Sequence, residues 1–279
     1  VTRKAEVIML VGSNPEEAHP VIGMQIRAAV ERGCRLIVVD PRDIGLAAHA
    51  DIHLKLRPGT NVAFANGIVN YLIQHELYDE DFVRERTEGF EILAATVRDY
   101  TPELVEDICG IDRRDLVAAA KMYAAADAAA IMYCLGVTEH STGTDGVMAL
   151  SNIAMISGNL GKPGGGVNPL RGQNNVQGSC DMGMWPSLYP GYQRVSDPAV
   201  RAKFAAAWGV DEERLSLKEG FKLTDLPHGV AEGTIRAFYN FGEDPLQTEP
   251  DTAQMRATLE GLDLLISQDI FMTQTTALA

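Results

Sequence analysis

The sequence lacks several motifs that would identify a nucleotide or metal site directly. It contains neither the G-x-G-x-x-G fingerprint of dinucleotide-binding folds nor the G-x-x-x-x-G-K-[ST] phosphate loop. Its four cysteines are scattered and form no C-x-x-C pair. This spacing argues against a zinc site or an iron–sulfur cluster held by these residues, and buried reduced thiols are the simpler interpretation.

Cations and long apolar runs are also scarce. Lys and Arg number 24 against 38 Asp and Glu, for a net charge of −14. We therefore expect no nucleic-acid partner, and an anionic ligand needs local cations and backbone N–H groups. No apolar run reaches the length of a membrane span and no signal peptide is visible, so we expect no membrane insertion. Because the chain opens on Val1 and stops at "TTALA", we expect an internal fragment, with the cytoplasm as default compartment and the periplasm still open.

What the sequence does contain is an ordinary globular composition with a strand–helix alternation. Its 279 residues are 46% hydrophobic and 22% charged, enough for one large or two moderate domains. Short apolar runs at residues 6–12, 34–40 and 51–56 predict strands, and a helical pattern covers residues 21–31. This alternation is typical of a parallel sheet covered by helices on both faces, so the predicted fold class is α/β.

The rest of the chain continues in the same style. Residues 161–168 are a loop by composition, and "NPLRGQNNVQGSCDMG" (168–183) has neither helical nor strand period. The other predicted elements are helices at 62–77, 78–87, 113–126, 145–160, 198–208 and 252–259, and strands at 129–136, 234–242 and 262–269.

A loose internal repeat links the two ends of the chain. In "VGSNPEEAHP" and in "NFGEDPLQTEP" a strand ends in Gly and enters a turn with Asn-Pro or Asp-Pro, and in both halves a later strand ends in Asp. Two copies of one nucleotide-binding plan would produce this pattern. Chance similarity within one α/β fold would also produce it, and the sequence alone leaves both open.

Several polar residues follow the predicted strands, where parallel α/β sheets bind ligands. Gly12 would let a backbone approach a pyrophosphate, Asp40 would accept from ribose or guanine, and Arg42 would reach a phosphate. Gly59 and Asn61 would cap the next helix or contact a base. Taken in isolation, each motif favours an ordinary capped turn over a ligand site. Glu139 and His140 are expected at the same edge of the sheet, with no role for His140 as a base.

The stretch "GNLGKPGGGVNPLRGQNNVQGSCDMG" followed by "YPGY" closely resembles the catalytic subunit of molybdenum- or tungsten-dependent formate dehydrogenases, in the bis-molybdopterin-guanine-dinucleotide oxidoreductase superfamily. The resemblance covers essentially the whole chain. It implies two αβα lobes with mainly parallel sheets, each holding one pterin guanine dinucleotide, with the metal between them. Residues 1–173 resemble the first lobe and residues 174–279 part of the second, which is discontinuous in the family. Further motifs occur in the family's order: "GSNPEEAHP", "VVDPR", "TEGFE", "YTPE", "GVTEHSTGT", "GEDPLQT" and "QDIFMT".

By motif match, the resemblance assigns Arg171 to the substrate. In the family this Arg faces the metal and holds the formate carboxylate. The chemistry suits the role, because a planar guanidinium matches a small planar anion bidentately where Lys would be a point charge. An Arg that only bridges the two lobes is the simpler structural alternative. The cofactor-binding residues implied in the same way are Gly12, Asn14, Glu17, Asp40, Arg42, Gly59, Asn61, Gly136, Glu139, Gly172, Gln173, Gly242, Asp244, Thr248, Gln268 and Asp269.

One position departs from the pattern, since some relatives have Gln where this chain has Glu139. The family's Cys cluster for a [4Fe–4S] centre, its metal ligand (Cys or selenocysteine) and its cofactor-capping domain have no counterpart in this chain. The resemblance implies oxidation of formate to CO2, with two electrons leaving through the pterin to the cluster and then to electron-transfer subunits. We expect the isolated fragment to be inactive.

Three other functions fit parts of the sequence. A nitrate reductase shares the "GKPG" region but lacks an Arg of the "RGQNN" type. A non-catalytic relative would keep the fold as a structural subunit, whereas this chain retains the Asp40, Asp244 and Gln268 turns together with Arg171. A free-standing guanine-nucleotide module is disfavoured by the missing phosphate loop. The choice between Mo and W, the electron acceptor and the oligomeric state are not determined by the sequence.

Overall fold

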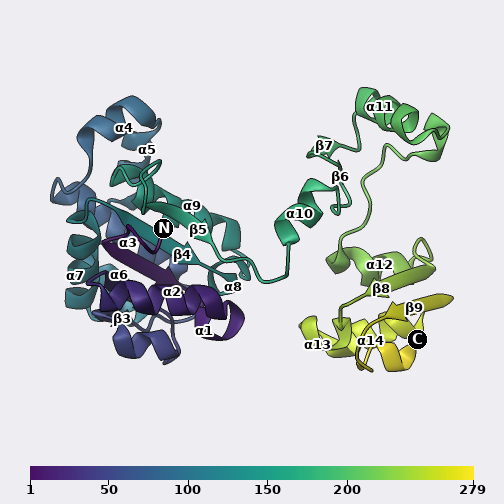
Figure 1. Ribbon diagram of the computed structural model, residues 1–279, viewed down its shortest axis with the longest axis horizontal. Coiled ribbons are helices and arrows are strands. Elements are labelled where there is room, and N and C mark those ends of the chain that lie inside the picture. Colours follow the sequence, from purple (N-terminus) through teal and green to yellow (C-terminus); the bar gives the residue numbers. More distant parts are fainter. The chain divides into compact units, whose positions relative to one another are not determined.

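The computed structural model describes residues 1–279, which divide into two compact units, Val1–Asn174 and Asn175–Ala279 (Figure 1). Each unit is described by itself. None of the helices combines the length and the apolar character needed to cross a membrane.

The first unit is built on a five-stranded sheet in which every pair of neighbours is parallel, in the order β3-β2-β1-β4-β5. The α/β prediction is therefore confirmed. From β1 the chain moves outward through β2 and β3, then returns to the other side of β1 with β4. The order thus reverses between β1 and β4, and such a switch point is where open α/β sheets place their ligands. The strands are β1 (Val7–Val11), β2 (Arg35–Val39), β3 (Ile52–Leu54), β4 (Ala129–Tyr133) and β5 (Gly166–Pro169).

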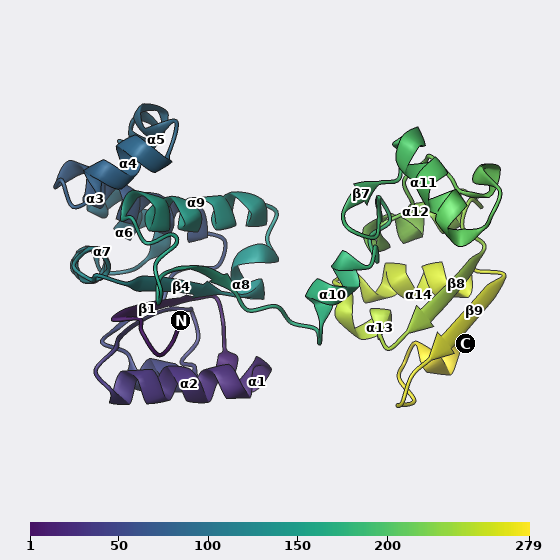
Figure 2. The ribbon, with the colours of Figure 1, turned by 45° about the horizontal axis from the view of Figure 1, so that its top comes forward.

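Helices cover both faces of this sheet (Figure 2). One face carries α1 (Pro15–Ala18), α2 (Pro20–Glu31) and the short 3-10 helix η1 (Gly45–His49). On the other face α3 is the central helix, because it packs against α5, α6, α7 and α9. The helices from α3 on are α3 (Asn61–Gln74), α4 (Glu80–Arg86), α5 (Phe90–Val97), α6 (Pro102–Cys109), α7 (Arg113–Ala124), α8 (Leu135–Thr138) and α9 (Gly143–Ile156).

The apolar run of β1 is explained by its central position. All five of its residues are buried, and they alternate between two cores. Val7, Met9 and Val11 pack with the α3, α7 and α9 side, whereas Ile8 and Leu10 pack with the α2 side. A strand buried on both faces needs apolar residues throughout, so it shows no polar alternation.

The second unit contains one parallel strand pair, β8 (Ala237–Phe241) with β9 (Leu264–Gln268). Phe238 and Leu265 point toward a small core formed with α12 (Leu226–Ala231), α13 (Pro245–Thr248) and α14 (Thr252–Glu260). The remaining elements are α10 (Val176–Asp181), the antiparallel pair β6 (Leu188–Tyr189) and β7 (Gln193–Arg194), α11 (Pro198–Trp208), and the 3-10 helices η2 (Glu212–Arg214), η3 (Leu223–Asp225) and η4 (Thr276–Leu278).

One prediction for the middle of the chain was wrong. Residues 161–168 do not form a loop throughout, because Gly166–Pro169 pairs with β4 as the edge strand β5. Residues 168–183, which show neither period in the sequence, contain the end of β5 and the helix α10, and residues 170–175 between them form neither helix nor strand. A four-residue edge strand with no buried residue shows no alternation, and a six-residue helix is too short to show a period. The strand predicted at 129–136 ends earlier, at Tyr133, and α8 follows.

Burial of Cys34 predicts a loss of stability at alkaline pH. Its thiol lies in the α2-side core, and burial, aided by the Asp51 carboxylate, raises its pKa to about 11. The unfolded thiol ionises near its ordinary value of 9.0, so from about pH 9 to pH 11 the unfolded state holds fewer protons and stability falls. Across this range the free energy of unfolding should fall by about 3 kcal/mol. Chemical denaturation from pH 8 to pH 11 checks it. Cys34→Ala should flatten the pH dependence, and an unchanged slope would contradict the assignment.

Candidate functional site

Two glycines meet at the switch point of the first sheet. Gly12 follows β1 in the left-handed region (φ +54°), and a Cβ there would lie 2.6 Å from the carbonyl carbon of Gly136. The N–H of Gly136 donates to the Gly12 carbonyl over 3.0 Å, and the N–H of Gly12 donates to Val39 over 2.9 Å. The ends of β1, β2 and β4 are therefore tied together by main-chain contacts that leave no room for a side chain.

A pocket of about 210 Å³ opens at these strand ends. Five residues that the sequence predicted as cofactor-binding line it, although they come from four separate segments. They are Gly12, Asp40, Arg42, Asn61 and Gly136. His140 also lines the pocket, so this residue belongs to the wall even though no catalytic role was expected for it.

Asp40 and Arg42 form a local ion pair at the mouth of this pocket. The Asp40 Oδ1 accepts the Arg42 main-chain N–H at 2.9 Å and its Nε–H at 3.4 Å. Only 4% of the Asp40 side chain is exposed against 65% of the Arg42 side chain. The carboxylate is therefore held in place, whereas the guanidinium reaches solvent. In a chain of net charge −14, this is a local cation of the kind that an anionic ligand needs.

The start of α3 forms another wall of the pocket. Asn61 Nδ2 donates to the Gly136 carbonyl over 3.2 Å, and His140 Nε2 contacts the same oxygen at 3.1 Å. The side chain of Thr60 donates backward to Arg57 (2.7 Å) and does not cap the helix. Of the two roles that the sequence left open for Asn61, capping of this helix by its side chain is not found. The first N–H groups of this 14-residue helix keep their partial positive charge.

The turn from β1 into α1 holds polar atoms that lack partners. Ser13 Oγ, Asn14 Oδ1 and His19 Nδ1 are all buried and make no hydrogen bond within the chain. Leaving such an atom unsatisfied costs on the order of 1–3 kcal/mol. Native proteins keep few of them, so three within seven residues make this turn a candidate site for a polar ligand.

Arg171 lies at the same edge of the sheet. It follows β5, whose carboxyl end points the same way as those of β1 and β4, and the preceding Leu170 donates its N–H to Tyr133 over 2.8 Å. The carbonyl of Arg171 contacts His19 Nε2. Its side chain is exposed within the first unit. Burial raises the pKa of the Tyr133 phenol, and the positive charge of Arg171 opposes that rise.

The other predicted residues of the first unit are less closely gathered. Gly172 lies beside α8, since a Cβ there would be 4.0 Å from Leu135 Cδ1. Residues outside the wall of the 210 Å³ pocket also include Glu17, Gly59, Glu139, Arg171 and Gln173. Glu17, on α1, and Glu139, at the end of α8, are exposed.

The second unit repeats the turn geometry of the first. Gly242 follows β8 with φ +65° and donates its N–H to Gln268 over 2.9 Å, as Gly12 does to Val39. The N-cap residues of the helices that follow also have similar backbone angles: φ −122° and ψ 77° at Asp244, and φ −115° and ψ 80° at Asn14. A buried Pro then begins a four-residue helix in each case. Of the two explanations left open by the sequence, this favours two copies of one local plan.

A pocket of about 600 Å³ lies at the carboxyl ends of β8 and β9. Four predicted residues line it: Gly242, Asp244, Gln268 and Asp269. Thr248 is adjacent, because its hydroxyl donates to Glu243 Oε1 over 3.0 Å. Sequence reasoning missed the exposed rings of Phe241 and Phe271 in the same wall. They offer a surface on which a base can stack, and no motif distinguishes them from ordinary apolar residues.

Part of this second pocket is already fixed by the chain itself. Asp244 Oδ1 accepts the hydroxyl of the buried Thr275 at 2.6 Å and its main-chain N–H at 3.1 Å. Asp269 Oδ1 accepts the N–H of Phe271 at 2.8 Å. These bonds hold the two loops that follow β8 and β9 in defined conformations.

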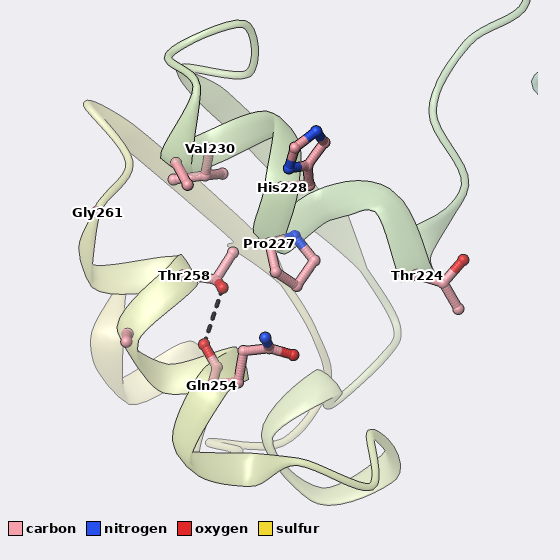
Figure 3. A pocket seen from close by; sticks show the side chains of 9 residues that line it. Thr224, Pro227, His228, Val230, Gln254, Thr258 and Gly261 are labelled. Carbon is pink, nitrogen blue, oxygen red and sulfur yellow. Dashed lines mark hydrogen bonds between the residues drawn. The ribbon is translucent and has the colours of Figure 1, made fainter.

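A wider hollow of about 630 Å³ lies between α12 and α14 and contains none of the predicted residues (Figure 3). His228 on its rim pairs with Glu232 at 3.1 Å, and Thr258 donates to Gln254 within α14 at 2.8 Å. The hollow contains no residue of the turns that follow β8 and β9, so the two pockets at the carboxyl ends of the strands are the candidate site.

Comparisons with known proteins relate the whole chain to one family. The family described as "Molybdopterin oxidoreductase" matches residues 2–279. The chain is 48% identical over 274 residues to "Formate dehydrogenase H" of Escherichia coli (strain K12), covering 98% of this chain and 38% of that protein. It is 45% identical over 275 residues to "F420-dependent formate dehydrogenase 1 subunit alpha" of Methanococcus maripaludis, covering 99% of this chain and 40% of that protein.

A solved structure shares the fold. "Acetylene Hydratase from Pelobacter acetylenicus" matches with a TM-score of 0.76 and 24% identity, covering 100% of this chain and 40% of that one. The chain thus spans about two fifths of the length of the relatives it matches. With the family match over nearly all residues, and two strand-end pockets in an α/β fold, the chain belongs to the molybdopterin oxidoreductase family.

Proposed function

We propose that this chain is the central, cofactor-binding part of a formate dehydrogenase catalytic subunit that oxidises formate to CO2. The observation that carries the proposal is Arg171 in the "RGQNN" motif, located at the ligand-binding edge of the sheet beside the unsatisfied β1–α1 turn. The two relatives named above, both called formate dehydrogenases, support it at 48% and 45% identity.

The role of Arg171 follows from its chemistry. Formate is a one-carbon carboxylate, so a guanidinium can bind both oxygens with two parallel N–H bonds and fix the direction of the C–H bond. Each such charged hydrogen bond contributes on the order of 1.5–3 kcal/mol. Gly172 adds no side chain beside it, and Gln173 adds polar atoms without charge. The positive charge near Tyr133 is the local attraction that an anionic substrate requires in an acidic protein.

The residues present fit a bis-molybdopterin guanine dinucleotide with Mo or W. The first dinucleotide would be held by the β1–α1 turn, the Arg42 cation, Asp40 and Asn61, and the second by the matching turn at Gly242–Asp244. When bound, this group supplies the two-electron chemistry, while the protein supplies binding, orientation and charge. A [4Fe–4S] cluster and the electron-transfer subunits would be held outside these residues.

Two alternatives remain testable in the same protein. A nitrate reductase would need no carboxylate-binding Arg at this position, and a non-catalytic structural subunit would need no cofactor. The full-length protein should reduce a dye with formate but not turn over nitrate, and it should contain Mo or W and release guanine on hydrolysis. The chain alone should be inactive. Nitrate turnover without formate turnover would overturn the proposal, and a metal-free, guanine-free protein would favour the structural subunit.

A further inference from the structure

His19 connects the β1–α1 turn to the substrate residue across 152 positions of the sequence. Its Nε2 contacts the main-chain carbonyl oxygen of Arg171. A carbonyl oxygen only accepts hydrogen bonds, so Nε2 must carry the proton. In the neutral ring the other nitrogen, Nδ1, is then an acceptor.

The main chain of His19 is held rigidly. Its N–H donates to the carbonyl of Pro15, the first residue of α1, and its carbonyl accepts the N–H of Gly23 in α2, both over 2.9 Å. A Cβ on Gly23 would lie 3.0 Å from the Glu16 Cα, which shows how closely the two helices pack. The ring therefore extends from a fixed junction between two helices, which suits a residue that must position another.

Arg171, in contrast, needs positioning. The sheet ends at Pro169, and Leu170 makes the last sheet-type bond, to Tyr133. The Arg171 side chain is exposed and has four rotatable bonds, so a fixed main chain at its base narrows the directions that the guanidinium can take. A hydrogen bond to the Arg171 carbonyl fixes that base.

The other ring nitrogen of His19 lacks a hydrogen-bond partner. His19 Nδ1 is buried without a partner, and so are Ser13 Oγ and Asn14 Oδ1 in the same turn. Ser13 is only 3% exposed, so bulk water does not satisfy its hydroxyl. As an acceptor, Nδ1 can take an N–H or O–H from a bound group, and a pterin guanine dinucleotide carries several such donors.

We propose that His19 is a positioning residue that couples cofactor binding to the orientation of Arg171. Its Nε2–H holds the Arg171 main chain, while its Nδ1 accepts a hydrogen bond from the cofactor, so that each contact fixes the ring for the other. The inference rests on the proposed function for its kinetic consequence, but the contact between His19 and Arg171 does not.

The kinetic test uses the cofactor-loaded, full-length protein. If His19→Ala lowers the fraction of molecules with a correctly directed Arg171 to about a tenth, the KM for formate rises about tenfold while kcat changes less than twofold. His19→Gln restores a donor near the Nε2 position and should bring the KM back to within threefold. His19→Asn places its amide near Nδ1, too short to reach Arg171, and should resemble His19→Ala.

His75→Ala is the matched control. His75 also contacts a carbonyl in the first unit, that of Tyr71 at 3.0 Å, but it lies at the end of α3. This variant should leave the KM for formate unchanged. An unchanged KM for formate in His19→Ala would overturn the proposal. So would a near-normal KM in His19→Asn together with a raised KM in His19→Gln.

A second readout separates this inference from the proposed function. Amide hydrogen exchange of residues 168–174 should accelerate in His19→Ala but not in His19→Gln or His75→Ala, with or without formate. A wild-type protein that does not oxidise formate would refute the proposed function and leave this measurement valid. Unaltered exchange at 168–174 in His19→Ala would refute the coupling even if formate oxidation is established.

Discussion

Arg171→Ala should lower kcat/KM for formate by at least about a hundredfold in the full-length protein. Two charged hydrogen bonds of on the order of 1.5–3 kcal/mol each are lost, which corresponds to about 10²–10⁴ in rate. Arg171 is exposed within its unit, and neither its side chain nor its main chain contributes to a hydrophobic core. The fold should therefore survive, and metal and guanine content should match the wild type. Steady-state kinetics with formate and a dye acceptor measure the effect.

Two variants make this prediction specific. Arg171→Lys keeps the charge without the planar fork, so it should recover only part of the lost activity. Arg84→Ala removes another exposed guanidinium, on α4, whose partners are the exposed Asp81 and Glu85, and should leave kcat/KM unchanged. If Arg171→Ala retains kcat/KM within threefold at full metal content, Arg171 does not hold the substrate.

Gly12→Ala should destabilise the first unit by on the order of 3–5 kcal/mol. Its Cβ would lie 2.6 Å from the carbonyl carbon and 2.9 Å from the Cα of Gly136, and both are main-chain atoms of α8, which follows β4. They can move away only if β1 and β4 separate at their carboxyl ends. The positive φ adds strain for any residue with a side chain. Amide exchange of β1 and β4 measures the loss in this unit, and guanine content should fall with it.

Substitutions at two other glycines distinguish the steric contact from the backbone strain as causes of this loss of stability. Gly59 has φ +87° but no atom within 4 Å of a Cβ, so Gly59→Ala should cost only the strain of about 1–2 kcal/mol. Gly136→Ala would place a Cβ 2.7 Å from the Gly12 Cα without a positive φ, so it should reproduce most of the steric loss. A Gly12→Ala protein no less stable than Gly59→Ala would show that the close contact is unimportant.

The sequence by itself determined the local structure and the family. Five consecutive apolar residues identify β1 as a central strand, and Pro at the first helical position marks where α2 and α11 begin. The family follows from "RGQNN" and its neighbours, a rare arrangement of residue types rather than a periodicity. These features depend on interactions between residues close in the chain, which any reader of the sequence can evaluate.

The tertiary structure decided which of these residues meet. Nothing local indicates that Gly12 packs against Gly136, that residues 166–169 pair with β4, or that His19 reaches the carbonyl of Arg171 across 152 positions. Each contact depends on the order of the strands, and that order is set by how two cores are buried on opposite faces of one sheet. The free energy gained by burying apolar side chains depends on residues that are far apart in the sequence. It therefore selects among strand pairings that the local conformational preferences do not distinguish.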